Sequence, residues 1–360
     1  FFTLLDQLNV LRSRIIFPKA TEHIPEQIAL IETLEAKGVT YTTSDGVYFD
    51  TSVFPSYGEL GNIDIEHLKE GARVDANAEK RNPTDFALWK FSKPEEKRQQ
   101  EWESPWGTGF PGWHLECSAM SAKYLGTTFD IHTGGVDHIP VHHNNEIAQS
   151  ETANGVPLAN YWLHVNHILI NSEKISKSLG NSLYLEDLEQ ENISPLAYRY
   201  WLLTADYKTL VNVSFESLKA ATTAFEKLVA TLARLPDAGT IHPAYQTKLA
   251  QACADDVGTP KAIALIWELL KDASVSPADK KATIFDIDRI LGLNLEALAF
   301  LASDVMASIQ APAHVRAIAD EREKARKARD FTKADALREM IEEEGFEVID
   351  GPNGYQLVPR

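Results

Sequence analysis

The sequence has few cysteines, few methionines and no long apolar run. Two cysteines among 360 residues, Cys117 and Cys253, are too few for a disulfide framework, so we expect a reducing, cytoplasmic location. No apolar run approaches the roughly 20 residues that a helix needs to cross a bilayer, which excludes a membrane-spanning protein. The chain does not begin with methionine, and Phe1 opens directly into an amphipathic pattern without a helix-start or signal-peptide feature. We therefore expect that an N-terminal part is missing.

The composition is that of a globular protein with an acidic balance. Lys and Arg number 35 and Asp and Glu number 52, so the formal net charge is −17, and 44% of the residues are hydrophobic. These values exclude a collagen-like fibre and a disordered tail. A chain of 360 residues exceeds what one hydrophobic core usually serves, so we expect two or three domains.

The first elements alternate between helix and strand patterns. Apolar residues at helical spacing predict a helix over 24–37, which ends at Gly38 because glycine tolerates the left-handed backbone found after helices. The segments 39–41 and 47–49 flank an Asp-Gly turn and predict a β-hairpin. The polar, turn-rich stretch 52–97 then predicts an insertion between core elements and not a separate domain.

Residues 104–181 carry the pattern of the C-terminal half of a doubly wound α/β sheet. We expect a Gly/Pro-rich loop at 104–112, a helix at 113–125 and a strand at 129–132. A second helix at 142–153, a second strand at 161–170 and a polar loop at 171–181 are expected to follow. In such sheets the ligand-binding residues gather at the ends of the strands. The chemistry is therefore expected there.

Beyond Ser194 the pattern becomes helical. The spacing of apolar residues predicts helices over 197–203, 215–235, 260–270 and 282–290. These helices predict a helical domain. Farther along, we expect one long charged helix over 313–340 and a small hairpin that pairs 346–349 with 355–358.

The strongest candidate site combines Cys117, His142 and Glu146. On a helix, His142 and Glu146 project from one face about one turn apart, so both can reach one cation. A thiolate, an imidazole and a carboxylate are zinc ligands, although a fourth is missing from this set. The alternative is structural: Cys117 is a small buried apolar residue and the histidines cap a helix. His132 and His138 lie in the same stretch, and this clustering favours a functional site.

A second candidate is the loop 174–181, which contains two lysines, two serines and a glycine directly after a predicted strand. Such a loop can bring cationic charge and backbone N–H donors to a polyphosphate. The alternative is a solvated surface loop, which is the usual role of lysine and serine alone. The loop therefore becomes specific only in combination with other motifs.

A third feature is a local excess of positive charge. Residues 314–338 contain eight basic and five acidic residues, so this segment carries +3 within an acidic chain. A basic stripe of this kind suits a nucleic-acid phosphate backbone. The alternative is a helix covered with ion pairs between neighbouring turns, and charge alone favours that alternative.

Several strings taken together resemble the cysteinyl-tRNA synthetases, a family of class I aminoacyl-tRNA synthetases. The matching strings are ATEHIP at 20–25, DFALWK at 85–90, GWHLECSAM at 112–120, FDIH at 129–132, NEIAQSE at 145–151, KISKS at 174–178, TPKA at 259–262 and ADALR at 334–338. They follow one another along the whole chain, which makes agreement by chance far rarer than for a single motif.

The resemblance implies a fold of three parts. These are the C-terminal part of a class I Rossmann-like α/β catalytic domain, an α-helical bundle that binds tRNA, and a small C-terminal α+β region that binds the anticodon. We expect the catalytic domain at 1–190, with an insertion around 40–100, the helical domain at 191–303 and the last region at 304–360.

The resemblance also implies an activity, which is ATP-dependent ligation of L-cysteine to cysteine tRNA through a cysteinyl-adenylate. The expected partners are cysteine tRNA, L-cysteine and ATP with magnesium, and neither a membrane nor DNA is expected. One zinc per subunit is implied on Cys117, His142 and Glu146, and the fourth ligand would be a cysteine upstream of this chain. The metal is implied because thiolate coordination separates cysteine from serine.

Further residue roles follow from the same resemblance. Lys177 contacts the ATP phosphates, and it acts in catalysis together with Lys174. Two further residues of the loop, Ser176 and Ser178, bind ATP. Substrate is bound by Trp113, His132 and Asp137. Thr133, Val141, Asn144 and Ile175 stand where the resemblance predicts glycine, proline, glutamate and methionine. The His-Ile-Gly-His-like signature of the family does not occur in these 360 residues.

Three alternatives remain open. The cysteine ligase of mycothiol synthesis resembles the family in its catalytic half, but the basic C-terminal segment favours tRNA as the acceptor. A non-catalytic tRNA-binding paralogue would bind tRNA without activating cysteine. A zinc hydrolase would need a general base beside Cys117, His142 and Glu146. It would also leave unexplained the loop 174–181, here called the lysine loop.

Overall fold

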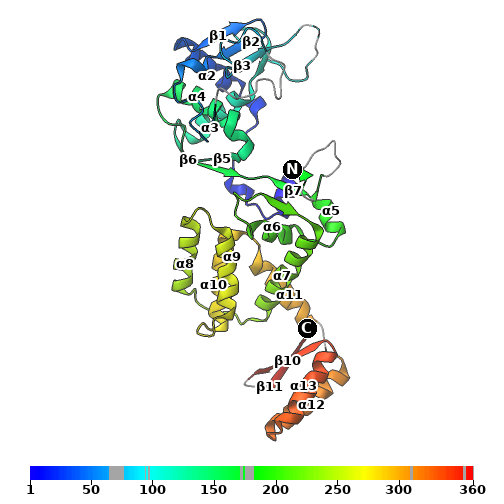
Figure 1. Cartoon of the computed structure of the whole chain (residues 1–360). Helices are drawn as coiled ribbons and strands as arrows, with labels where there is room; N and C mark the ends of the chain where they lie inside the picture. The colour runs from blue at the N-terminus through cyan, green and yellow to red at the C-terminus, as the bar shows by residue number, and fades with distance from the viewer. Residues whose placement is uncertain are drawn as a thin grey trace. The chain divides into compact units, whose positions relative to one another are not determined.

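The computed structural model describes residues 1–64, 77–93, 95, 98–170, 173–174, 182–308, 311–351 and 354–359. The chain divides into two compact units. The first, here called the site unit, comprises Ser13–Leu169 and Tyr207–Asn212. The second, here called the helical unit, comprises Phe1–Arg12, Ile170–Asp206 and Val213–Arg360. Figure 1 follows the chain through both.

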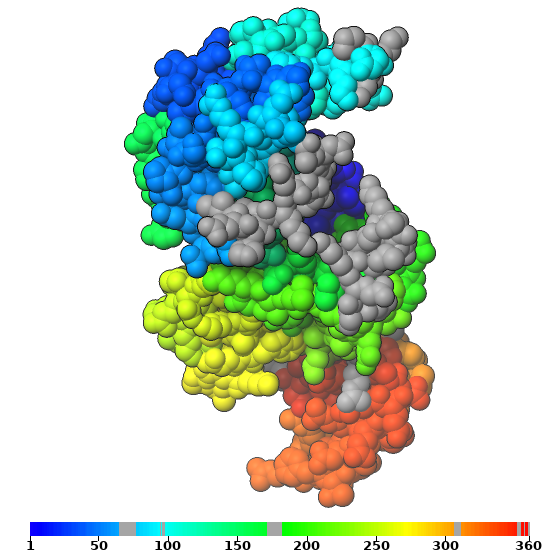
Figure 2. Space-filling view, turned by 45° about the horizontal axis from the view of Figure 1, so that its top comes forward, coloured from blue at the N-terminus to red at the C-terminus, as the bar shows by residue number. Residues whose placement is uncertain are grey.

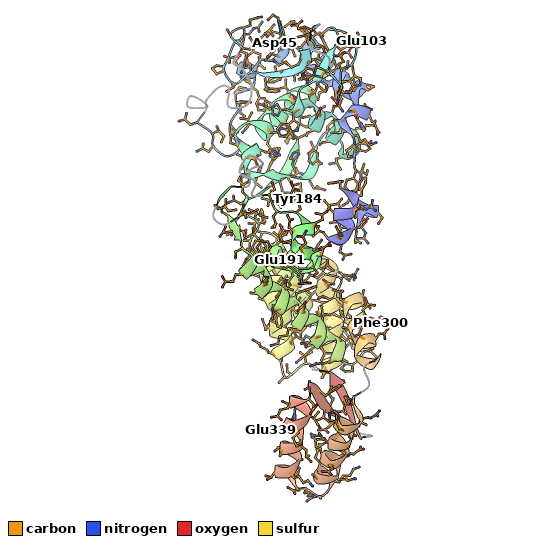
Figure 3. The ribbon with its side chains drawn as sticks, turned by 90° about the vertical axis from the view of Figure 1, so that its right-hand side faces the viewer. Asp45, Glu103, Tyr184, Glu191, Phe300 and Glu339 are labelled. Carbon is orange, nitrogen blue, oxygen red and sulfur yellow. The ribbon has the colours of Figure 1, made fainter. Side chains whose placement is uncertain are left out.

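The site unit begins with a helix that packs on an antiparallel sheet. The predicted helix is confirmed as α2 (Ile24–Ala36), and Gly38 adopts the positive φ of +71° that closes it. The predicted hairpin is confirmed as β1 (Thr40–Thr43) and β2 (Gly46–Phe49), with Asp45 in its turn, as labelled in Figure 3. Short 3₁₀ turns occur at Arg12–Arg14, Ala20–Glu22 and Thr51–Val53.

The sheet continues with β3 (Phe86–Phe91) and β4 (Gly109–Pro111), in the order β1-β2-β3-β4. The polar stretch 52–97 therefore contains an inner strand of the sheet, β3, whose side chains Leu88 and Trp89 are fully buried. They join Ile31 and Leu34 of α2 in one apolar core. In Figure 2 these elements belong to the blue to cyan part of the space-filling view.

The elements that carry the candidate site follow the sheet. They are α3 (Trp113–Leu125), β5 (Phe129–Gly135), a 3₁₀ turn (Val136–His138), a π-helical turn (Ile139–His143), α4 (Asn144–Asn154) and β6 (Ala159–Val165). β5 and β6 pair in parallel, with His132 opposite Trp162 and Gly134 opposite His164. The predicted strand 161–170 is interrupted at Asn166 and His167, where the Asn166 side chain accepts the next backbone N–H at 2.8 Å.

Three short strands lie near the boundaries between the units: β7 (Ile168–Ile170), β8 (Glu173–Lys174) and β9 (Val211–Val213). The helical unit contains α1 (Phe2–Gln7), α5 (Leu185–Gln190), α6 (Pro195–Leu203), α7 (Phe215–Arg234), α8 (Pro243–Ala254), α9 (Thr259–Lys271), α10 (Pro277–Leu291) and α11 (Leu295–Ser308). The four predicted helices are confirmed as α6, α7, α9 and α10. Among the described residues, no helix has the length and apolar character that a membrane crossing requires.

The longest of these helices shows why the prediction succeeded. The Ser214 hydroxyl caps α7 by accepting the Ser217 N–H at 3.2 Å. Leu218, Phe225 and Leu232 then recur on its buried face. The aromatic Phe300 of α11, labelled in Figure 3, is by contrast 64% exposed.

The prediction of one long helix over 313–340 is wrong. The structure has two helices, α12 (Ala313–Lys327) and α13 (Phe331–Glu343). The chain turns between them because Arg329 adopts a positive φ of +61° and the Asp330 carboxylate accepts the Lys333 N–H at 3.1 Å as an N-cap. The predicted hairpin is confirmed as β10 (Phe346–Gly351) and β11 (Gly354–Pro359).

Candidate metal and substrate site

The three predicted zinc ligands come together in the site unit. Cys117 lies one turn into α3, His142 lies at the end of the π-helical turn and Glu146 lies in the first turn of α4. Their ligand atoms all lie within 4.8 Å of one another. His142 Nε2 is 2.6 Å from Glu146 Oε1, and both side chains are buried. The spacing of four residues thus brings imidazole and carboxylate together, as predicted.

Glu146 is a buried carboxylate that stays charged. Burial raises its pKa, but the close imidazoles of His132 and His142 outweigh burial and lower the pKa to about 2. His132 Nε2 lies 3.0 Å from the second carboxylate oxygen. The geometry of these two contacts does not make a hydrogen bond, so neither oxygen has a hydrogen-bond partner among the described residues. Buried charges of this kind are ordinarily paired or bound to a metal.

The Cys117 thiol lies in surroundings that disfavour its thiolate form. Burial and then the negative charge of Glu146 raise its pKa to about 12. A bound cation would reverse this balance, because a metal deprotonates a coordinating thiol. The close placement of the thiol and the carboxylate is therefore more favourable with a bound cation than without one.

The orientation of His142 depends on a second histidine. Its Nδ1 lies 2.8 Å from Nδ1 of His114, and burial followed by the neighbouring His142 lowers the pKa of His114 to about 3. Neutral His114 can accept the Nδ1–H of His142. In that tautomer His142 keeps its Nε2 lone pair available for a metal ion, and a hydrogen-bond acceptor on the other ring nitrogen is the usual support of a metal-binding histidine.

A second group of ligand atoms shares the same carboxylate. His132, His143 and Glu146 also place their ligand atoms within 4.8 Å of one another. His143 Nδ1 lies 2.8 Å from His164 Nε2, and burial lowers the pKa of His143 to about 3. The floor of the site is thus a set of imidazoles around one carboxylate.

Aromatic rings stand beside these imidazoles. The Trp113 ring, half exposed at the start of α3, has its centroid 4.3 Å from that of His142 and 5.5 Å from that of His138. The Trp162 ring lies 4.6 Å from His132. Trp113 therefore forms an accessible apolar wall next to a predicted metal ligand.

The other predicted site residues differ in how far they can be placed. Asp137 lies in the 3₁₀ turn after β5, close enough to Gly135 that a Cβ there would overlap its carboxylate. The backbone of Lys174 lies in β8. Ser176, Lys177 and Ser178 lie outside the described residues.

Sequence reasoning missed some members of the site. His143, Trp162 and His164 were not predicted to act there. The parallel register places Trp162 opposite His132 and His164 opposite Gly134, so both residues on β6 reach the site through strand pairing. The sequence did indicate that Trp162 and His164, two positions apart on a predicted strand, point to the same side of it. Only the pairing with β5 shows that this side faces the site.

The basic segment 314–338 is partly neutralised. Arg322 is buried and makes two hydrogen bonds to the Asp350 carboxylate, at 2.7 and 3.0 Å, and Arg326 pairs with the same carboxylate. Lys327 pairs with Glu323 at 3.2 Å. Two of the arginines thus pair across to β10, and Lys327 makes a pair between neighbouring helical turns of the kind that the alternative predicted.

Comparison with known proteins places the chain in a family. Residues 1–223 match the family described as tRNA synthetases class I (C) catalytic domain. A cysteine–tRNA ligase 1 of Burkholderia lata is 47% identical over 97% of this chain and 73% of its own length. The cysteine–tRNA ligases of Opitutus terrae and Escherichia coli are 42% and 41% identical, over 75% and 77% of their lengths.

A solved structure agrees at the level of the fold. The methionyl-tRNA synthetase of Mycobacterium tuberculosis, solved with methionyl-adenylate, superposes with a TM-score of 0.51 over 87% of this chain and 80% of its own, at 14% identity. The α/β and helical fold class predicted from the sequence is confirmed. With relatives of this identity and coverage, the chain belongs to the cysteine–tRNA ligase family of class I aminoacyl-tRNA synthetases.

Proposed function

We propose that this chain charges cysteine tRNA in two steps. A carboxylate oxygen of L-cysteine attacks the α-phosphorus of ATP, which forms cysteinyl-adenylate and releases pyrophosphate. A ribose hydroxyl at the 3′ end of the tRNA then attacks the adenylate carbonyl carbon, which forms cysteinyl-tRNA and releases AMP. The observation that carries the proposal is the identity of up to 47% to cysteine–tRNA ligases over nearly the whole chain.

We propose that Cys117, His142 and Glu146 hold one zinc ion. The donor set fits the metal because it joins a thiol, an imidazole nitrogen and a buried carboxylate whose oxygens have no hydrogen-bond partner among the described residues. When bound, zinc would hold the substrate sulfur as a thiolate. Trp113 would then close one side of the amino-acid pocket.

Such a site would explain the choice of cysteine over serine. The two amino acids differ by one atom, and apolar contacts discriminate such pairs only weakly. A soft thiolate is a far better zinc ligand than a neutral hydroxyl. The neighbouring residues His132 and Asp137 are proposed to bind the remaining polar groups of the amino acid.

The lysine loop is proposed to act on ATP. Lys177 and Lys174 would offset the negative charge that builds up on the departing pyrophosphate, and Ser176 and Ser178 would bind the phosphates together with magnesium. This contribution is largest in the transition state, when the charge moves onto the pyrophosphate. The loop should therefore affect rate more than cysteine binding.

The proposed domains divide these tasks. Residues 1–190, with the insertion around 40–100, would form the catalytic domain, 191–303 the helical tRNA-binding domain and 304–360 the anticodon-binding region. The proposed location is the cytoplasm, and cysteine tRNA is the proposed nucleic-acid partner, without DNA or a membrane.

The full-length protein tests this function directly. We expect cysteine-dependent exchange of pyrophosphate into ATP, and cysteine transfer to cysteine tRNA. Exchange without tRNA charging would favour a ligase for a small-molecule amine such as the mycothiol precursor. Binding of tRNA without exchange would favour a non-catalytic relative.

A further inference from the structure

An uncommon backbone turn carries one of the proposed zinc ligands. Residues Ile139–His143 form a π-helical turn with Pro140 as its second residue, and His142 lies near its end. π-Helical turns are rare, and they occur mostly at functional sites. Because this wide turn is not the intrinsic preference of the backbone, other contacts must hold it.

Asn144 makes those contacts from the first position of α4. Its side chain is 2% exposed, and its Nδ2 donates to the carbonyl oxygens of Ile139 at 2.6 Å and of Leu60 at 3.2 Å. Its Oδ1 accepts the backbone N–H of Gly58 at 3.1 Å. One carboxamide thus joins the first residue of the π-helical turn to a distant loop.

That loop, Tyr57–Gly61, makes two further contacts, one to the start of α4 and one to the π-helical turn. The Tyr57 hydroxyl donates to Oδ1 of Asn145 at 2.5 Å, and both residues are buried. Gly61 has a φ of +81°, and a Cβ there would overlap Cγ2 of Ile139. Hydrogen bonds and close packing therefore fix the same loop against the same turn.

We propose that Asn144 and the loop Tyr57–Gly61 position the zinc ligands by holding the π-helical turn. The proposal rests on the proposed zinc site. Asn144 touches none of Cys117, His142 and Glu146 through its hydrogen bonds, so it acts through the backbone that carries His142.

The chemistry of the contact requires a carboxamide. A carboxylate of the same size accepts hydrogen bonds but cannot donate to two carbonyl oxygens. Loss of a group that orients a metal ligand typically weakens metal binding by about 10- to 100-fold.

The test compares Asn144→Asp with Asn154→Asp in the full-length protein. Both changes replace a carboxamide with a carboxylate in α4, but Asn154 is exposed at the other end of the helix. Zinc affinity is measured by competition with a chromophoric chelator, and ligand geometry by the visible spectrum of the cobalt-loaded protein. We expect Asn144→Asp to weaken zinc binding by about tenfold and to shift the cobalt spectrum, and Asn154→Asp to change neither.

Two outcomes would overturn the proposal in distinguishable ways. If wild-type protein binds no zinc, the proposed zinc site itself fails. If wild-type protein binds zinc and Asn144→Asp binds it equally well with the same cobalt spectrum, the positioning role fails.

Where Asn144→Asp does not fold, Tyr57→Phe provides a second test. It removes one hydroxyl and should weaken zinc binding about fivefold, as loss of one hydrogen bond does. Unchanged zinc binding in that variant would also reject the positioning role.

Discussion

His142 Nε2 lies 2.6 Å from Glu146 Oε1, and both side chains are buried one helical turn apart. Neither carboxylate oxygen has a hydrogen-bond partner among the described residues. Together with the Cys117 sulfur, whose distance to both ligand atoms is within 4.8 Å, this pair forms the proposed zinc site.

Glu146→Gln tests that reading of the pair. The change keeps the size of the side chain but removes the negative charge, so we expect zinc affinity to fall by at least about tenfold. Chelator competition measures the loss. Glu32→Gln, on the exposed face of α2, is the matched control and should bind zinc like the wild type. Equal affinity in both variants would remove Glu146 from the zinc shell.

Lys177→Ala tests the proposed role of the lysine loop. Because Lys177 would stabilise charge that builds up during the reaction, we expect adenylate formation to slow by about 100-fold or more while cysteine binding changes little. Rapid-quench measurement of adenylate and equilibrium binding of cysteine separate the two effects. Lys19→Ala serves as a control on an exposed lysine. Equal effects on rate and binding would mean that the loop binds substrate uniformly.

Arg322→Met tests the buried ion pair of the C-terminal region. Arg322 is 5% exposed and makes two hydrogen bonds to Asp350. Its removal leaves a partly buried carboxylate without its main partner, so we expect a loss of about 2 kcal/mol in the free energy of unfolding. Urea denaturation measures it, and Lys324→Met, an exposed change on the same helix, should cost less than about 0.5 kcal/mol.

The same ion pair predicts how stability changes in acid. The hydrogen bonds from Arg322 lower the pKa of Asp350 below its ordinary value near 3.8. Because the unfolded chain then binds more protons than the folded one, this contribution is complete above about pH 5 and is lost as the pH falls through the folded pKa. We expect Asp350→Asn to flatten this part of a profile of unfolding free energy against pH. An unchanged profile would show that Asp350 titrates alike in both states.

The elements that the sequence predicted well have a local cause. α2 follows from apolar residues at helical spacing and from Gly38. The hairpin of β1 and β2 closes over Ser44 and Asp45, and Gly46 is the first residue of β2, where a Cβ would overlap the Trp89 carbonyl oxygen. By contrast, the only local sign of a break that the structure reveals in the segment 313–340 is the N-cap Asp330, and the turn before it needs a positive φ at the non-glycine residue Arg329. No local rule anticipates that conformation.

The site shows the same division between local and distant information. Helical spacing was enough to bring His142 toward Glu146, because both lie on neighbouring turns of one segment. In α4 the usual pattern of exposed polar residues does not hold, since Asn144 and Gln149 are buried. His164 joins the site only through the register of β6 against β5, which depends on residues far apart in the chain.

The most direct test of the central claim is cysteine-dependent pyrophosphate exchange by the full-length protein, with serine in parallel, before and after removal of zinc by a chelator. We expect exchange with cysteine and not with serine, loss of exchange on zinc removal and recovery when zinc is restored. Exchange that survives zinc removal, or that accepts serine as readily as cysteine, would contradict a zinc-dependent choice of cysteine at Cys117, His142 and Glu146.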